Sequence, residues 1–397
     1  MSGKLRLRLV LLALVVFSLS VATWLLWSDS VHSEDQPPDR SSSREQSSVR
    51  QAARALSASE DSGDRAADSA LLQMIEKFRD EFARSPDGET SREILEALRQ
   101  TIREAPDEQE AAAALASYLK SGVDVFTKLP FEVGEEGMLE TAPTLRTALL
   151  DLLVTLDPTL ALELARTIMN QTSSPDEYAI ALRNLAWNDL DGDLQPELAS
   201  RFEQLIERDE WRKSPSAGFL EAFDAAVQLN SEPQFSSLLK LAAEGNEAAN
   251  SSLTRASMMA LDRMTLRRPE LLIRQFDSDP TLAGIEPKLR ASLLSRLDLA
   301  DPVQREIFTN YLTTTNHGEG ELEYFGQLFP NGNYLHGHWM ISTPESTPSI
   351  AQRAEKDRQI LAQLEQLATE KPEIQTSQAF VSIKSRLKEI TAPPETK

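Results

Sequence analysis

The chain has 397 residues, a net charge of −21 at pH 7 and no cysteine. Without cysteine it has no disulfide, no lipid-modified N-terminal cysteine, no cysteine metal ligand and no cysteine nucleophile. The acidic charge disfavours nucleic acid and anionic lipid surfaces, because affinity for them comes largely from lysine and arginine neutralising phosphates. A protein partner with a basic surface is compatible with this charge. At 41% hydrophobic residues, the chain can bury a long core or two domains.

The first feature in chain order is an uncharged apolar run from Leu9 to Trp27, which follows a basic flank. As a helix it spans about 28 Å, close to the hydrocarbon core of a bilayer, so it predicts a single membrane-spanning signal anchor. Trp24 and Trp27 at its far end suit the membrane interface. The flank is expected to stay in the cytoplasm and the body to be exported, to the periplasm or the cell surface. The alternative is a cleaved secretory signal, with Ser18 and Ser20 spaced as signal peptidase requires.

The body of the chain has the apolar spacing of amphipathic helices, with a proline recurring every 33 to 38 residues. Proline is favoured in the first turn of a helix, where its missing N–H has no intrahelical partner. Each of these prolines therefore predicts a helix start: Pro158, Pro196, Pro233, Pro269 and Pro302. Between them, Ser174-Pro175 and Ser214-Pro215 predict serine-capped starts of the companion helices.

A period near 37 residues and segments such as LDPTLALELARTI and SPDEYAIALRNLAW resemble the HEAT and tetratricopeptide families of helical repeats. The Trp-x-x-Leu-Gly pattern of tetratricopeptide repeats is absent, so the likeness is to a HEAT-like array over residues 141–314. The resemblance implies an all-α fold, an α-solenoid of helix hairpins, that presents a surface to other proteins.

Composition and spacing together predict the order of the segments along the chain. They are a cytoplasmic basic flank (1–8), the membrane anchor (9–27), a disordered linker (28–68), an N-terminal helical unit (69–120), an irregular connection (121–140), the repeat array (141–314), an aromatic, glycine- and histidine-rich loop or hairpin (315–348), two C-terminal capping helices (349–390) and a disordered tail (391–397).

The loop at 315–348 holds most of the candidate site residues. Its aromatic side chains are candidates for contact with a protein partner: Tyr324, Phe325, Phe329, Tyr334 and Trp339. An extended segment at this position can offer its edge to an incoming peptide, or its side chains can cap the end of the array.

The same loop holds three histidines, His317, His336 and His338. Two imidazoles two residues apart point the same way on an extended strand, and nearby glutamates can add a ligand, which is a pattern compatible with zinc or copper. The alternative is that the histidines are ordinary polar residues of an aromatic loop and bind no metal.

The sequence contains no signature of a serine hydrolase, a phosphate-binding loop or a dinucleotide site. We therefore expect a membrane-anchored, extracytoplasmic scaffold or adaptor that binds other proteins without catalysis. The alternatives are a metal-binding protein or metal-dependent enzyme that uses the three histidines, and a passive stalk or spacer.

Overall fold

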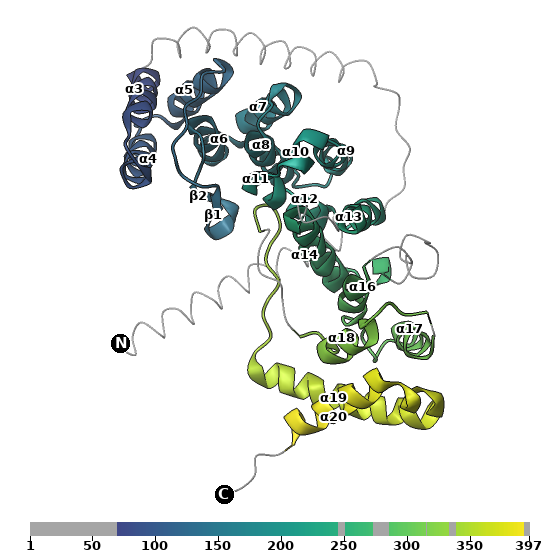
Figure 1. The fold of residues 1–397 in the computed structure, drawn as a ribbon. Helices are drawn as coiled ribbons and strands as arrows, with labels where there is room; N and C mark the ends of the chain where they lie inside the picture. Colours follow the sequence, from purple (N-terminus) through teal and green to yellow (C-terminus); the bar gives the residue numbers. More distant parts are fainter. Residues whose placement is uncertain (1–69, 245–250, 273–285, 315, 333–338, 393–397) are drawn as a thin grey trace, which may run out of the picture. The chain divides into compact units, whose positions relative to one another are not determined.

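The computed structural model describes residues 70–244, 251–272, 286–314, 316–332 and 339–392, all of which belong to the second of two compact units, Ser62–Lys397. These residues are mostly α-helical, as Figure 1 shows, so the all-α prediction is confirmed for them. No helix among them is both long and apolar enough to span a bilayer. The anchor predicted from Leu9 to Trp27, with Trp24, lies outside the described residues.

Three amphipathic helices open the described part of the chain: α3 (Ala70–Arg84), α4 (Gly88–Arg103) and α5 (Glu108–Lys120). The carboxylates of Asp87 and Asp107 accept hydrogen bonds from backbone N–H groups in the first turns of α4 and α5. These caps satisfy donors that have no partner within the helix and so fix where each helix starts.

The next stretch, expected to be irregular, contains a small antiparallel hairpin. Strand β1 (Glu132–Val133) pairs with β2 (Leu139–Thr141), and the short helix η1 (Glu135–Gly137) joins them. Gly137 closes the turn at a φ of +76°, a backbone conformation that glycine adopts without a steric penalty. Gly134 N–H donates to the Met138 carbonyl at 2.7 Å across the turn.

The region of the expected repeats is a succession of helices in which neighbours pack on each other, for example α7 on α8 and α13 on α14. The helices are α6 (Leu145–Leu156), α7 (Pro158–Gln171), α8 (Pro175–Trp187), α9 (Gln195–Ile206), α10 (Asp209–Lys213), α11 (Ala217–Glu221), α12 (Asp224–Leu229), α13 (Glu232–Glu244), α14 (Ser251–Arg267), α16 (Pro287–Leu294) and α17 (Pro302–Thr313).

The five recurring prolines begin helices, as predicted. Pro158 and Pro302 are the first residues of α7 and α17, and Pro196 and Pro233 are the second residues of α9 and α13. Residues 269–272, which begin with the fifth proline, are helical up to the end of the described stretch.

The two predicted serine caps have different outcomes. Ser174 caps α8, because its Oγ accepts a hydrogen bond from Glu177 N–H at 3.2 Å. The prediction at Ser214 was wrong, since α11 starts two residues later and its cap is Ser216. Ser216 Oγ accepts from Phe219 N–H at 3.2 Å and donates to the Asp176 carboxylate at 2.6 Å, an anchor on α8 that Ser214 lacks.

Buried arginine–aspartate pairs link these helices across the core. They join residues 32 to 39 positions apart, and no partner has more than 3% of its side chain exposed: Asp151 with Arg183, Asp224 with Arg263, and Asp262 with Arg296. A buried charge that loses its partner is strongly destabilising, so each pair fixes the relative placement of two helices.

The C-terminal part consists of α18 (Glu321–Leu328), α19 (Ile350–Glu370), η4 (Pro372–Thr376) and α20 (Gln378–Thr391). Helix α20 packs on both α18 and α19. The two helices expected at 349–390 correspond to α19 and α20, whereas α18 falls inside the segment expected to be a loop.

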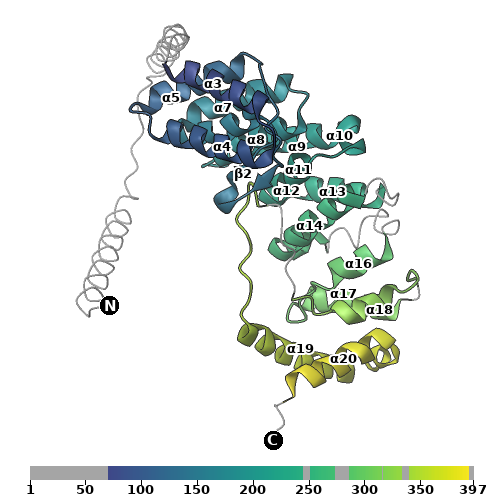
Figure 2. The same cartoon turned by 60° about the vertical axis from the view of Figure 1, so that its left-hand side comes forward.

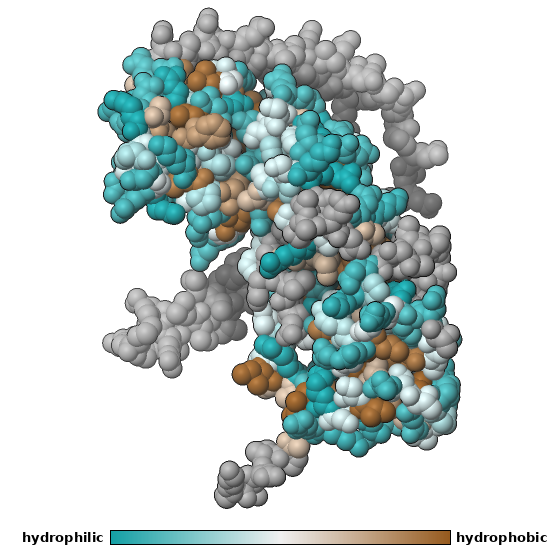
Figure 3. Space-filling model, in the orientation of Figure 1, coloured by the Kyte–Doolittle hydropathy of each residue, from teal (hydrophilic) through white to brown (hydrophobic). Residues whose placement is uncertain are grey.

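The face of the molecule drawn in Figure 3 is mostly hydrophilic, with smaller hydrophobic patches between polar areas. Large apolar side chains of the described residues are mainly in the core. Phe126 and Leu190, which are 76% and 90% exposed, are exceptions.

Candidate functional site

The first wall of the candidate site is the β1–β2 hairpin, which a buried ion pair holds in place. Arg183 on α8 donates to the Asp151 carboxylate on α6 and, at 3.0 Å, to the Gly137 carbonyl in the turn. Asp151 in turn accepts a hydrogen bond from Leu139 N–H at 3.2 Å. Arg99 on α4 donates to the Leu139 and Glu140 carbonyls at 2.6 and 2.9 Å. The hairpin is thus fixed to three helices through its backbone.

The second wall is residues 339–345, which we call the clasp segment. Figures 1 and 2 show that the chain leading into α19 runs from the vicinity of α12 without helical turns. Asp224, at the start of α12, accepts hydrogen bonds from the backbone N–H groups of Ile341 and Ser342 at 2.6 and 2.7 Å and from the Ser342 hydroxyl.

Arginines of α14 complete the attachment of the clasp segment. Arg263 donates to Asp224 at 2.8 Å, to Ser342 Oγ at 2.9 Å and to the Thr343 carbonyl at 3.1 Å. Both Arg263 and Arg267 bind the carboxylate of Glu345, at 2.7 and 2.8 Å. Burial raises the pKa of Asp224, and the Arg263 charge and the hydrogen bonds from Ser342 and Ile341 only partly oppose this.

Hairpin and clasp segment meet at Gly137. A Cβ at this glycine would lie 2.5 Å from the Met340 carbonyl oxygen, a distance that real Cβ atoms essentially never show, and a tight 3.0 Å from a ring carbon of Trp187. Only glycine therefore allows the turn, the clasp segment and the last residue of α8 to pack this closely.

These three elements line a cavity of about 740 Å³ that is open to solvent, which we call the tryptophan pocket. Two tryptophans, Trp187 and Trp339, contribute to its lining, together with the apolar side chains of Val133, Ile341 and Pro344. The remaining lining residues are Gly134, Glu135, Glu136, Gly137, Glu140, Ser342 and Thr343.

The charged residues of the tryptophan pocket are all acidic. Glu135, Glu136 and Glu140 are exposed, and none of them forms an ion pair with a residue that the structure describes. No lysine or arginine lines the cavity. Arg183 lies over the Trp187 ring at 4.2 Å, but it is fully buried and bound to Asp151. The pocket therefore combines apolar side chains with three carboxylates that have no ion-pair partner in the described part of the chain.

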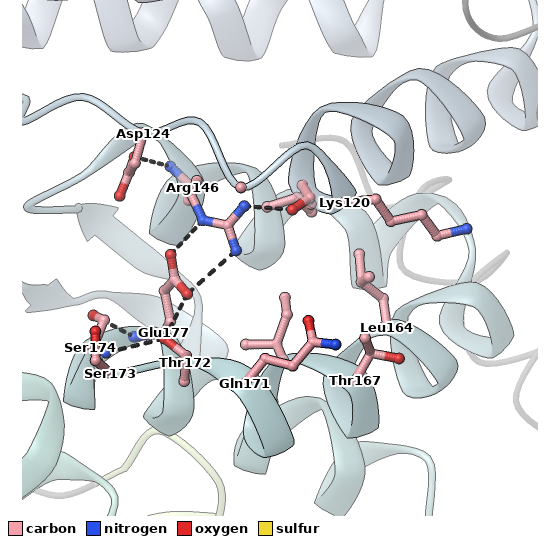
Figure 4. A pocket seen from close by; sticks show the side chains of 13 residues that line it. Lys120, Asp124, Arg146, Leu164, Thr167, Gln171, Thr172, Ser173, Ser174 and Glu177 are labelled. Atoms are coloured by element: carbon pink, nitrogen blue, oxygen red, sulfur yellow. Dashed lines mark hydrogen bonds and ion pairs between the residues drawn. The ribbon is translucent and has the colours of Figure 1, made fainter.

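A second cavity of about 600 Å³ lies between the end of α5, the start of α6, and α7 and α8 (Figure 4). Three of its charged residues, Asp124, Arg146 and Glu177, are hydrogen-bonded to each other. Arg146 Nε donates to Glu177 at 2.6 Å, and Glu177 also accepts from the Thr172 hydroxyl at 2.8 Å. Asp124, whose pKa burial raises, accepts from the backbone N–H of Arg146 at 3.0 Å. Figure 4 shows the Lys120 amine directed away from this network. The arrangement is that of a structural ion pair beside a cavity.

The aromatic residues proposed as partner contacts fall into three groups. Trp339 lines the tryptophan pocket, whereas Tyr334 lies outside the described residues. Phe325 and Phe329 are completely buried and pack with Phe308 at ring-centroid distances of 5.8 and 4.8 Å. These two rings form core, not an exposed surface.

Tyr324, on α18, is partly buried and packs against the same core. Of the five predicted contacts, Trp339 lines the tryptophan pocket.

Of the three histidines proposed as metal ligands, His317 is the one that the structure describes. Its Nε2 lies 2.8 Å from the Tyr311 carbonyl oxygen, and its ring packs edge-on against Tyr311 at 5.0 Å. The described residues contain no group of three or more potential ligands that could hold a metal ion. His336 and His338 lie outside the described residues.

Comparison of the chain with protein-family models, curated proteins and solved structures gave no match.

Proposed function

We propose that this chain is a non-catalytic scaffold or adaptor that binds another protein through the tryptophan pocket. The pocket itself is the observation that carries the proposal. Two tryptophans line a cavity together with carboxylates that lack ion-pair partners among the described residues. Aromatic side chains in pockets are typical anchors of protein interfaces, because they bury a large apolar area.

In this proposal the helices over residues 141–314 are a HEAT-like α-solenoid. Support comes from the prolines that recur as helix starts and from the ion pairs that join residues 32 to 39 positions apart. A repeat array of this kind supplies a rigid support on which the hairpin and clasp segment are mounted.

We also propose that the segment from Leu9 to Trp27 anchors the chain in a membrane, with the body on the extracytoplasmic side. The support is its uncharged length, its basic flank and the tryptophans at its far end. Membrane fractionation tests this: the full chain is expected in the carbonate-resistant pellet, and recovery in the supernatant would contradict an anchor.

The binding function is tested by cross-linking the full-length chain in cells, followed by affinity purification and mass spectrometry. A Trp187→Ala/Trp339→Ala variant is expected to lose a partner that the wild type captures. Phe126→Ala is the matched control, because it removes an exposed aromatic ring outside the pocket. A partner captured equally by all three proteins would show that the pocket is not the binding site.

A further inference from the structure

We infer that the tryptophan pocket takes a short peptide segment of the partner in which an apolar side chain stands next to lysine or arginine. This inference rests on the proposed function and gives the chemistry of its ligand. The apolar side chain packs on the tryptophan-lined cavity, and the cation pairs with the carboxylates around it.

The charge of the pocket selects a cation. Glu135, Glu136 and Glu140 come from one turn and the strand that follows it, and they are exposed and without ion pairs among the described residues. Like charges held near each other at a cavity attract an oppositely charged ligand and repel an acidic one. Four arginines contact lining residues, and each is paired with a carboxylate outside this set of three: Arg99 with Glu96, Arg183 with Asp151, Arg263 with Asp224, and Arg267 with Glu345.

Trp187 acts as an apolar contact and not as one wall of an aromatic cage for a cation. The guanidinium of Arg183 already lies over the Trp187 ring at 4.2 Å and uses the attraction of its π-face. A second cation on this ring would be repelled by the positive charge of Arg183. The ligand cation is therefore placed at the glutamates, and the tryptophan rings receive the apolar side chain.

The central residues of the clasp segment cannot pair with the backbone of a peptide. The clasp segment therefore contacts the ligand through side chains. A peptide that adds as a strand needs free N–H and C=O groups on the edge that it joins. The N–H groups of Ile341 and Ser342 are bound to Asp224, and the carbonyl of Thr343 is bound to arginines of α14. Recognition must then come from the pocket.

The size of the cavity sets the size of the ligand. A volume of about 740 Å³ is within the range of about 300–1,000 Å³ typical of sites that enclose a drug-sized molecule. That is room for a few side chains, which fits a short segment of the partner.

The test is fluorescence polarisation of labelled peptides with the full-length chain. The probe peptide has one leucine between two lysines in a Gly-Ser background; one comparison peptide has glutamate for lysine, and another has serine for leucine. Of the three peptides, we expect only the Lys-Leu-Lys peptide to bind. Its affinity is expected to fall as the salt concentration rises. Glu135→Gln/Glu136→Gln/Glu140→Gln is expected to weaken it by about tenfold or more.

The matched control is Glu163→Gln/Glu207→Gln/Glu210→Gln, which changes the net charge equally at exposed glutamates outside the pocket. An equal loss of affinity in both variants would show that the effect comes from net charge alone, and it would overturn the inference. Binding of the glutamate peptide, or of none, would also overturn it. If partner capture in cells still depends on Trp187 and Trp339 in those cases, the adaptor function stands with a different ligand chemistry.

Discussion

Asp224 binds Arg263 at 2.8 Å in a pair that is at most 1% exposed, and Asp224 also holds the backbone of a segment that follows it by more than 110 residues in sequence. The carboxylate accepts two backbone N–H groups and a hydroxyl of the clasp segment in addition to the guanidinium. A buried aspartate with this many donors organises its surroundings, because each donor would otherwise be buried without a partner. The wall of the tryptophan pocket thus depends on a residue that does not line it.

Asp224→Ala is expected to destabilise the protein by about 2–4 kcal/mol, because Arg263 keeps only Glu345 as a carboxylate partner and two N–H groups of the clasp segment lose their acceptor. Urea unfolding followed by circular dichroism measures this change. Asp191→Ala is the control, since Asp191 is exposed in a turn, and it is expected to change stability by less than about 0.5 kcal/mol. Similar stability of the two variants would contradict the role assigned to the buried pair.

Gly137→Ala and Gly122→Ala separate backbone strain from steric contact with the clasp segment. Both glycines have positive φ, +76° and +73°, so alanine is strained at each. A Cβ at Gly122 meets nothing within 4 Å, whereas one at Gly137 would meet Met340 and Trp187. We expect a loss of about 1 kcal/mol at Gly122 and about 2–4 kcal/mol at Gly137.

Tryptophan fluorescence provides a second measurement for this pair. In Gly137→Ala the emission is expected to shift, because Trp187 and Trp339 lose their packing, and in Gly122→Ala it is expected to stay as in the wild type. Equal stability losses with unchanged spectra in both variants would show that the hairpin and clasp segment do not pack closely.

The helices could be predicted from local patterns, and the pocket could not. A proline at a helix start, as at Pro158 and Pro302, is determined by the missing N–H of the residue itself and is visible in the sequence. The pocket joins Gly137, Trp187 and Trp339, which are brought together by buried Asp–Arg pairs. A charged residue between apolar ones gives no sign of which distant residue it pairs with.

The aromatic residues of the expected loop also show that sequence patterns do not reveal long-range contacts. The aromatic composition of the loop made Trp339 a candidate contact, and it gave Phe325 and Phe329 the same role. Their burial depends on Phe308 of α17 and on the formation of α18, neither of which the sequence places next to them. The β1–β2 hairpin was missed because its strands are only two and three residues long, too short for an alternating pattern.

Glu321→Gln is expected to make stability less dependent on pH in the acid range. Glu321 is fully buried; burial alone would raise its pKa, but hydrogen bonds from Arg290, Gly318 N–H and Tyr311 lower the pKa below its ordinary value of 4.5. A lowered pKa means that the ionised form stabilises the fold above pH 4.5 and that this stabilisation is lost as the pH falls through the folded-state pKa. The wild type is therefore expected to exceed the variant by about 2 kcal/mol near pH 7 and by less at low pH.

Urea unfolding of both proteins at several pH values measures that difference. Comparison with the variant is necessary because burial raises the pKa of Asp224 and Asp262, which changes stability in the opposite direction over the same range. These aspartates are present in both proteins and cancel in the difference. A difference that stays constant down to about pH 3 would contradict the lowered pKa of Glu321.

Ser216→Ala and Ser214→Ala distinguish the observed start of α11 from the one that the Ser-Pro pattern predicted. Ser216 Oγ accepts from Phe219 N–H and donates to Asp176, a carboxylate whose pKa burial raises. Its removal is expected to cost about 1–2 kcal/mol, because a helix donor and a half-buried carboxylate both lose a partner. Ser214 is exposed, and its loss is expected to change the free energy of unfolding by less than about 0.5 kcal/mol. Thermal and urea unfolding measure both values, and the reverse order would place the cap at Ser214 and move the start of α11 by two residues.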